Sequence, residues 1–459
     1  MLRNHPLVLV GSLIAGALLT GCAVSPAIPE GRSYPPSHLL APRDVATRRS
    51  PENQGSAPLG DDASLQDYLA YAAVNNPGLE AAFRRWKAAM ERMPQVTSLP
   101  DPKFQYAYFI EEVETRVGPQ EQKFTLSQMF PWFGKLRLKG EMAARQAEAK
   151  WQSYQEKKLE LFYEVKRAYA EYYFLGRSIE ITADNLQLLK YLEEVAREAF
   201  RTGEGAHSDV VRAQVEIGKL EDRLESLREM KGPRAADLNA ALGRPARADL
   251  PVPTLLPEEY AELSEDRLLT ALQESNPRLK ALGQMVGKAE AGVKLARKQY
   301  YPNFTLGVSY IETGSAVMPT DESGKDPVLA MVGINIPLWR QKYSAGVREA
   351  SARVRAAELS LSEKHYDLQG ELKRSVFGVE DARRKIRLYR ETLIPKAEES
   401  LKVTQAGFRT GEADFMDLLD AQRTLLDFQL TVERARSDHL ERLAGLEKLV
   451  GNALPREEP

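Results

Sequence analysis

Residues 199–204 read AFRTGE, and residues 407–412 read GFRTGE, 208 positions later. The stretch that follows is also repeated, as DVVRAQ over 209–214 and DLLDAQ over 417–422. Each copy lies between two long helical patterns, and its glycine can adopt the left-handed conformation that ends a helix. Ser208 and Asp414 are predicted to cap the helices that follow. Each copy therefore predicts the tip of a helical hairpin, and a repeat of this length indicates a duplicated domain, not a solenoid.

Composition excludes several classes of protein. The 459 residues allow two or three domains, and 43% hydrophobic with 28% charged residues is ordinary for an ordered protein. A formal net charge of −2 gives no reason to expect a nucleic-acid partner. The chain has no glycine-rich phosphate loop, paired metal-ligand histidines or nucleophile elbow. We therefore predict no enzymatic activity, no cofactor and no metal site, and we interpret His439, near an apolar seam, as a packed residue.

The N-terminus has the features of a secretory signal peptide, predicted over residues 1–21. Arg3 and His5 precede an apolar run over 7–19, and the chain continues Thr20-Gly21-Cys22. Residues 19–22 (LTGC) resemble the bacterial lipoprotein box, which implies that Cys22 is lipidated, becomes the new N-terminus and is sorted to the outer membrane. The alternative is an ordinary secretory signal that ends near a cysteine. Cys22 is the only cysteine, so no intramolecular disulfide is possible.

The rest of the chain divides into two similar halves. Residues 22–62 are rich in Pro, Ser, Arg and Gly and are predicted to be an extended tether. A first repeat is expected over 63–245, a proline-rich connection over 246–262 and a second repeat over 263–453. Each repeat opens with a helical pattern that is interrupted at an Asn-Pro pair, at 76–77 and at 276–277, because the residue before proline disfavours the α conformation.

Four segments, two in each half, alternate apolar and polar residues with a period of two. Each is predicted to be a strand of nine or ten residues with one apolar face, the length and pattern of a transmembrane β-strand. The alternative is two hairpins packed on a soluble core. Residues 111–120 and 314–326 are predicted to be polar turns. The apolar positions are Phe104, Tyr106, Tyr108 and Ile110; Phe124 and Leu126; Phe304, Leu306, Val308 and Tyr310; and Val328, Ala330, Val332, Ile334 and Ile336.

Helical patterns of about 65 residues run from the strands to the tips, and apolar residues recur along them at alternating steps of four and three. A helix this long cannot fold back into a compact globule and must pack along partners. Aromatic residues at the strand ends, in FPWFGK over 130–135 and IPLW over 336–339, suit a membrane interface or a packed corner. The first seam consists of Leu161, Val165, Ala168, Tyr172, Leu175, Ile179, Thr182, Leu186 and Leu189.

Taken together and in this order, these features resemble the TolC-type outer-membrane efflux family over about residues 62–453. Four strands cannot close a membrane barrel, and the residues alone leave both a dimer and a trimer open. The resemblance implies a mainly α-helical homotrimer with a 12-stranded transmembrane β-barrel continued by a periplasmic α-helical barrel. It also implies a passive efflux conduit in the outer membrane of a Gram-negative bacterium, with a periplasmic adaptor and an inner-membrane pump as partners. The FPWFGK string looks most like the heavy-metal efflux branch, which works with resistance-nodulation-division pumps.

A rival interpretation is a lipid-anchored periplasmic coiled-coil structural or adaptor protein, which explains the tether and the hairpins but not the strands. If the chain is a channel, the tips are predicted to dock the adaptor, and acidic residues near the second tip are predicted to form a ring that narrows the tunnel. A solvated acidic surface is the alternative for each gate candidate. The docking candidates are Arg201, Thr202, Gly203, Arg409, Thr410 and Gly411. The gate candidates are Asp414 and Asp417, then Glu412, then Glu398 and Glu399.

Overall fold

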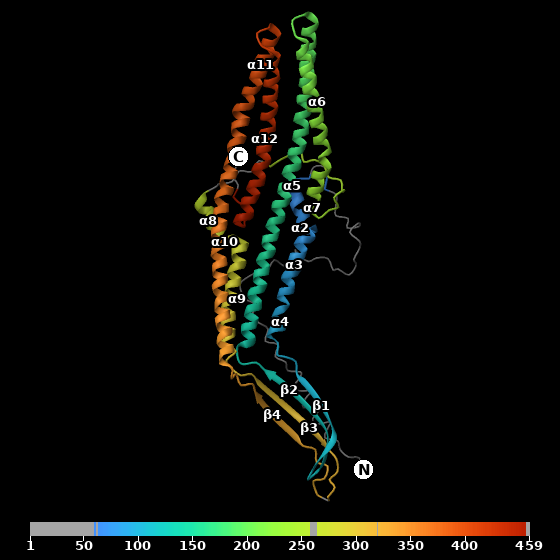
Figure 1. Cartoon of the computed structure of the whole chain (residues 1–459), viewed down its shortest axis with the longest axis vertical. Helices are drawn as coiled ribbons and strands as arrows, with labels where there is room; N and C mark the ends of the chain where they lie inside the picture. Colours follow the sequence, from blue (N-terminus) through green and yellow to red (C-terminus); the bar gives the residue numbers. More distant parts are fainter. Residues whose placement is uncertain (1–58, 61–62, 258–263, 319, 456–459) are drawn as a thin grey trace. The chain divides into compact units, whose positions relative to one another are not determined.

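The computed structural model describes residues 59–60, 63–257, 264–318 and 320–455. All of them belong to one compact unit that begins at Leu59. Both halves follow the same order of helices, two strands and a long helical hairpin (Figure 1). The first half contains α2 (Leu65–Asn75), α3 (Pro77–Met90), α4 (Arg92–Thr97), β1 (Lys103–Thr115), β2 (Gly118–Phe130), α5 (Lys135–Thr202), α6 (His207–Glu229) and α7 (Lys231–Leu242). The second contains α8 (Glu265–Ser275), α9 (Pro277–Lys298), β3 (Phe304–Thr313), β4 (Val328–Ile334), α10 (Arg340–Leu388), the π-helix η2 (Tyr389–Leu393), α11 (Ile394–Thr410) and α12 (Phe415–Val450).

The Asn-Pro interruptions are confirmed, and each asparagine also binds the last helix of its own half of the chain. The Asn76 side chain accepts a hydrogen bond from the Leu79 N–H and donates to the Ala241 carbonyl at 3.0 Å. Asn276 makes the same pair of contacts and reaches the Leu449 carbonyl at 2.7 Å. The asparagine therefore caps one helix and satisfies the carboxyl end of another, which a break in the helical pattern alone did not predict.

The long helices of the two halves differ in continuity. α5 runs without interruption for 68 residues. Its counterpart is divided into α10 and α11 by η2, directly before Pro395. Proline has no N–H and its ring clashes with the carbonyl four residues earlier, so a wider π-turn accommodates it. Among the described helices, none is both long and apolar enough to cross a membrane.

The predicted seam is confirmed as the contact surface of α5. Leu161, Val165 and Leu189 are each at most 1% exposed. α5 packs against α9 and α12 and also against α3, α6 and α7, so it has neighbours on several sides. His439 on α12 is buried, as predicted. The core is therefore a set of helix–helix seams and not one globular centre.

The four strands form one antiparallel sheet in the order β1-β2-β3-β4. The register places Phe124 between Tyr106 and Tyr310, so the apolar positions of neighbouring strands lie on one face. On the other face, the hydroxyl oxygens of Thr125 and Ser309 are 2.7 Å apart. The predicted alternation is confirmed within the four strands, but Ile336 lies outside the sheet because β4 ends at Ile334.

The predicted length of nine or ten residues is confirmed for β3 and wrong for the other three strands, and one predicted turn is wrong. β1 and β2 each have 13 residues, β3 has 10 and β4 has 7. Residues 111–115 belong to β1, and Gly118 already begins β2, so the turn is much shorter than the predicted 111–120 loop. Polar side chains did not mark the strand end because backbone pairing resumes at Val113 after a register shift.

Candidate functional site

The two hairpin tips have the same backbone conformation. Gly203 and Gly411 are left-handed, with φ of 79° and 78°, and each follows the last residue of its helix. The N–H of Glu204 donates to the Ala199 carbonyl at 2.8 Å, and the N–H of Glu412 donates to the corresponding carbonyl at the same distance. This is a Schellman ending, and the predicted helix-ending role of both glycines is confirmed. Apart from the glycine itself and its two neighbours in the chain, no atom of the described residues lies within 4 Å of a Cβ built on either glycine, so the requirement is conformational.

The helices that leave the tips begin differently. Asp414 accepts from the Met416 N–H at 3.3 Å, and Asp417 accepts from the Asp414 N–H at 3.2 Å, which makes a capping box. Ala206 stands at the position corresponding to Asp414, and its side chain makes no cap hydrogen bond. The prediction for Asp414 is confirmed. The prediction that Ser208 caps α6 is wrong, because the helix begins at His207 and Ser208 already lies in its first turn.

A small apolar cluster holds the two hairpins together just below the tips. Phe415, Leu418 and Leu419 at the start of α12 are at most 1% exposed and belong to one cluster with Leu189 and Leu192 of α5. Both tips therefore lie next to one shared apolar cluster, at the end of the long helices that is farther from the sheet (Figure 1).

The predicted docking residues are exposed at these ends. The Arg201 guanidinium pairs with Glu198 of its own helix at 3.0 Å. Arg409 instead donates to the hydroxyl of Tyr191 on α5, so it links the two hairpins. The Thr202 and Thr410 hydroxyls donate to carbonyls of the preceding turn, and both threonines are exposed.

The structure brings three of the five acidic gate candidates together at the second tip. Glu412, Asp414 and Asp417 are exposed there, the last two within the capping box. Glu398 and Glu399 lie on the exposed surface of α11, more than two turns before the tip. A hydrogen bond from the Lys396 ammonium at 2.7 Å, reinforced by its charge, lowers the pKa of Glu399.

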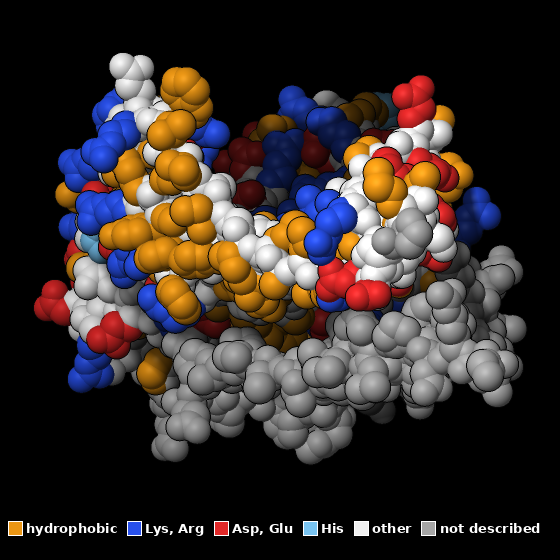
Figure 2. All heavy atoms as spheres, turned by 90° about the horizontal axis from the view of Figure 1, so that it is seen from below, with side chains coloured by type: hydrophobic (Ala, Val, Ile, Leu, Met, Phe, Trp, Pro, Cys, Tyr) orange, Lys and Arg blue, Asp and Glu red, His pale blue; other side chains and the backbone are white. Residues whose placement is uncertain are grey.

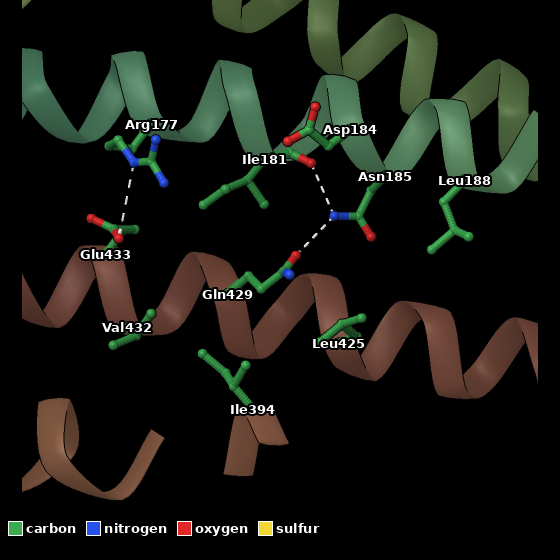
Figure 3. Close-up of a pocket in the computed structure, with 10 residues that line it drawn as sticks. All are labelled: Arg177, Ile181, Asp184, Asn185, Leu188, Ile394, Leu425, Gln429, Val432 and Glu433. Atoms are coloured by element: carbon green, nitrogen blue, oxygen red, sulfur yellow. Dashed lines mark hydrogen bonds and ion pairs between the residues drawn. The ribbon is translucent and has the colours of Figure 1, made fainter. Parts of the chain in front are cut away.

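Sequence reasoning missed a polar layer within the α5–α12 seam. The Asn185 amide donates to the Gln429 side chain at 2.9 Å (Figure 3). Its oxygen accepts from the Gln422 side chain at 3.2 Å. Beside this layer lies a cavity of about 360 Å³, bordered by the Arg177–Glu433 ion pair and by Ile394 of α11. The seam spacing left Asn185 and Gln422 between apolar positions, so their pairing was visible only in three dimensions. Buried polar pairs of this kind fix the register of packed helices.

Cys22 lies outside the described residues. Within the described residues, no group of three or more His, Cys, Asp or Glu side chains is placed to hold a metal ion.

Several solved outer-membrane channels share this fold of one four-stranded sheet and paired helical hairpins. Solved structures with this fold include the outer-membrane channel OprN, 17% identical with a TM-score of 0.72 over 84% of this chain and 90% of that chain. VceC from Vibrio cholerae is 19% identical with a TM-score of 0.70 over 85% of this chain and 96% of that chain. CusC is 15% identical with a TM-score of 0.70 over 84% of this chain and 92% of that chain.

The chain belongs to the outer membrane efflux protein family, whose model matches it twice, over residues 70–244 and 268–452. Nodulation protein T of Rhizobium leguminosarum bv. trifolii is 20% identical over 95% of both chains. Outer membrane protein TolC of Vibrio cholerae is 26% identical over 68% of this chain and 71% of that protein. The family and fold predicted from sequence are confirmed. The assignment to the heavy-metal branch stays a prediction.

Proposed function

We propose that this protein is the outer-membrane channel of a tripartite efflux system. It acts as a passive conduit that receives substrates from a periplasmic adaptor and an inner-membrane pump and releases them outside the cell. Membership of the efflux family and an exposed apolar sheet face support this assignment. The substrates are metal ions or small toxic compounds, and the FPWFGK string at 130–135 favours metal ions and a pump of the resistance-nodulation-division type.

The observation that carries the proposal is the sheet itself. β1 and β4 are its outer strands, and Ile110 and Val332 on its apolar face are 92% and 77% exposed. In lipid, such a face is favourable but an unpaired strand edge is not. Four strands are too few to close a barrel, since membrane barrels need at least about eight. Three copies that pair β4 of one with β1 of the next give twelve strands and no free edge.

Exposed apolar residues on the long helices support the same assembly. Tyr366 and Phe377 on α10 are 71% and 69% exposed and lie eleven residues apart, which places them on one helix face. On α6, Val211 and Val215 are exposed one turn apart. Such faces are expected to be covered by neighbouring copies in a helical barrel. The tips would then face the adaptor.

Cysteine pairs across the strand edges test the trimer. Ala107 in β1 and Met331 in β4 lie on the same face of the sheet. In a Cys22→Ser background, the double variant Ala107→Cys, Met331→Cys should give crosslinked dimers and trimers after oxidation, and larger species should be absent. Each single variant is the control. A double variant that stays monomeric under oxidation at this and neighbouring registers would contradict the barrel.

The lipid anchor is proposed at Cys22, and one variant separates the channel from the coiled-coil spacer. Cys22→Ser should lose fatty-acid labelling, and persistent labelling would refute the anchor. A channel with this substitution should still form trimers that only detergent extracts from the membrane. A spacer that is held by lipid alone should be released into the soluble fraction.

A further inference from the structure

Positive charge is concentrated where the sheet meets the helices. We define the junction collar as residues 98–103, 130–140, 294–304 and 334–343, which join the strands to α4, α5, α9 and α10. These segments contain nine Lys and Arg residues and a single acidic residue, Asp101, in a chain whose net charge is −2. The collar therefore carries a strong local field that the composition of the whole chain hides.

Within the described residues, eight of these nine cations form no ion pair with a carboxylate. Lys139, Arg297 and Arg340 are exposed. Within the described part of the chain, Arg137 is the one collar cation that forms an ion pair, with Glu141 at 3.6 Å and with its own side chain 75% exposed. Unpaired cations gathered on one surface repel one another, which favours an anionic occupant.

Aromatic side chains lie among the cations. Phe133 and Trp339 are 78% and 76% exposed. The Lys298 ammonium lies 5.3 Å from the centre of the Tyr301 ring. Seen from the sheet end, hydrophobic side chains gather on the side where β4 lies, and Lys and Arg side chains lie next to them (Figure 2). Moving from the sheet toward the helices, the protein surface changes from apolar strands to aromatic rings and then to cations. A membrane-embedded surface changes in the same order from the hydrocarbon core to the headgroups.

We infer that the junction collar binds anionic phospholipid headgroups of the periplasmic leaflet. This inference rests on the proposed function, which places the apolar sheet face in lipid. The headgroup region of a bilayer is roughly 5–8 Å thick on each side, about the rise of one helical turn. Lys139 and Arg297 lie within about that distance of the helix ends at the sheet. The phosphate oxygens of the headgroups would accept hydrogen bonds from these cations in place of carboxylates.

A four-site variant tests the collar. Lys139→Gln, Arg297→Gln, Arg340→Gln and Lys342→Gln together remove four exposed cations and leave a polar side chain at each position. The control variant removes the same number of exposed cations far from the sheet: Lys280→Gln, Arg223→Gln, Arg374→Gln and Lys402→Gln. Binding of phosphatidylglycerol and phosphatidylcholine to detergent-purified trimers would be measured by native mass spectrometry. One cation near an anionic surface contributes about fivefold in affinity. The collar variant should therefore bind phosphatidylglycerol at least about tenfold more weakly, and phosphatidylcholine unchanged.

Three outcomes would overturn the inference. The control variant could lose as much affinity for phosphatidylglycerol as the collar variant, or the collar variant could keep its preference for phosphatidylglycerol. Displacement of the lipid by millimolar inorganic phosphate would indicate a site for the free anion. Single-channel conductance in phosphatidylcholine bilayers keeps the proposed function separate. If the parent protein forms conducting trimers that show no preference for phosphatidylglycerol, the proposed channel function is supported and lipid binding at the collar is refuted. If the parent protein forms no conducting trimers, the proposed channel function is refuted.

Discussion

The Lys135 ammonium donates a hydrogen bond to Oδ1 of Asn303 at 2.8 Å and thereby joins the start of α5 to the residue before β3. The Trp132 N–H donates to the same oxygen, and Lys135 also donates to the Tyr301 carbonyl. The strand-to-helix corner of the first half is thus fastened to the strand entry of the second. Burial, with a smaller contribution from the Lys139 charge, lowers the pKa of Lys135, which is 4% exposed.

Replacing this lysine should therefore weaken the corner. Lys135→Met keeps the apolar stem and removes both hydrogen bonds, so the part-buried Tyr301 carbonyl and the Asn303 Oδ1 each lose a donor. The expected cost is about 1.5–3 kcal/mol, measured as a lower apparent Tm of the detergent-purified protein. Lys139→Met is the matched control, since it removes an exposed lysine one turn later and should change stability by less than about 0.5 kcal/mol. Equal melting of the two variants would refute a fastening role for Lys135.

A second prediction concerns pH and the contact between the hairpins. Glu216 on α6 accepts from Lys219 and pairs with Arg423 on α12, both at 2.8 Å. Burial raises the pKa of Glu216, but these two hydrogen bonds and the two positive charges outweigh it, and the pKa lies below its ordinary value of 4.5. The carboxylate therefore contributes stability that is present above about pH 4.5 and is lost as pH falls through the lowered pKa.

The corresponding experiment compares melting at neutral and acid pH. Glu216→Gln should be less stable than the parent by about 1 kcal/mol at pH 7. The difference should shrink toward zero as pH falls well below 4.5, because the parent then loses the same charge. Glu225→Gln removes an exposed carboxylate of the same helix and should show no such convergence. A gap between parent and Glu216→Gln that stays constant with pH would contradict the assigned role.

The sequence predicted the fold where its pattern is repeated. The two glycine-centred tips, the Asn-Pro breaks and the alternation of the strands all have local physical causes, and all three are confirmed. The interruption of the second long helix at η2 was missed although Pro395 was visible. A proline alone does not show whether a helix ends, bends or widens. That outcome depends on the helices packed beside it.

The candidate site was predicted less completely. The sequence placed Asp414 and Asp417 at the second tip, but it did not reveal that the two make a capping box with each other. Nor did it pair Arg409 with Tyr191, because these residues are 218 positions apart and belong to different hairpins. Contacts between halves depend on how the helices are rotated about their axes, and a seam pattern fixes that rotation only approximately.

Adaptor docking at the tips gives a third prediction. Arg201→Glu with Arg409→Glu reverses two exposed charges, and contacts of a partner with such charges are expected to weaken at least about tenfold. A photo-crosslinker at Thr410 in intact cells would report docking as the yield of crosslinked adaptor. Tyr191→Phe is the control, because it removes only the hydrogen bond of Arg409 to the other hairpin. If Tyr191→Phe lowers the yield as much as the charge reversal does, the tip-to-tip contact and not docking explains the loss.

The last prediction concerns the constriction. Threefold symmetry would turn an inward-facing carboxylate at the second tip into a ring of three like charges, which favours cations and narrows the tunnel. The capping box offers another explanation for Asp414 and Asp417, since an acidic residue at either position stabilises the start of α12 without any role in conduction. Alanine variants mix the two effects, because Asp414→Ala removes a charge and a cap worth about 1 kcal/mol.

Asparagine variants separate the two roles. Asparagine caps helices about as well as aspartate does, so Asp414→Asn should remove the charge and leave thermal stability nearly unchanged. Asp417→Asn removes the charge at N3 and keeps a side-chain oxygen that can accept from the Asp414 N–H. If these carboxylates form the ring, single-channel recordings of both asparagine variants should show larger conductance, weaker cation preference and reduced block by trivalent cations. If the residues only cap α12, the asparagine variants should conduct like the parent and Asp414→Ala should lose stability alone. The carboxylates of Glu412, Glu398 and Glu399 make no hydrogen bond to this cap. In that case, their glutamine variants would locate the ring either at the tip or along α11.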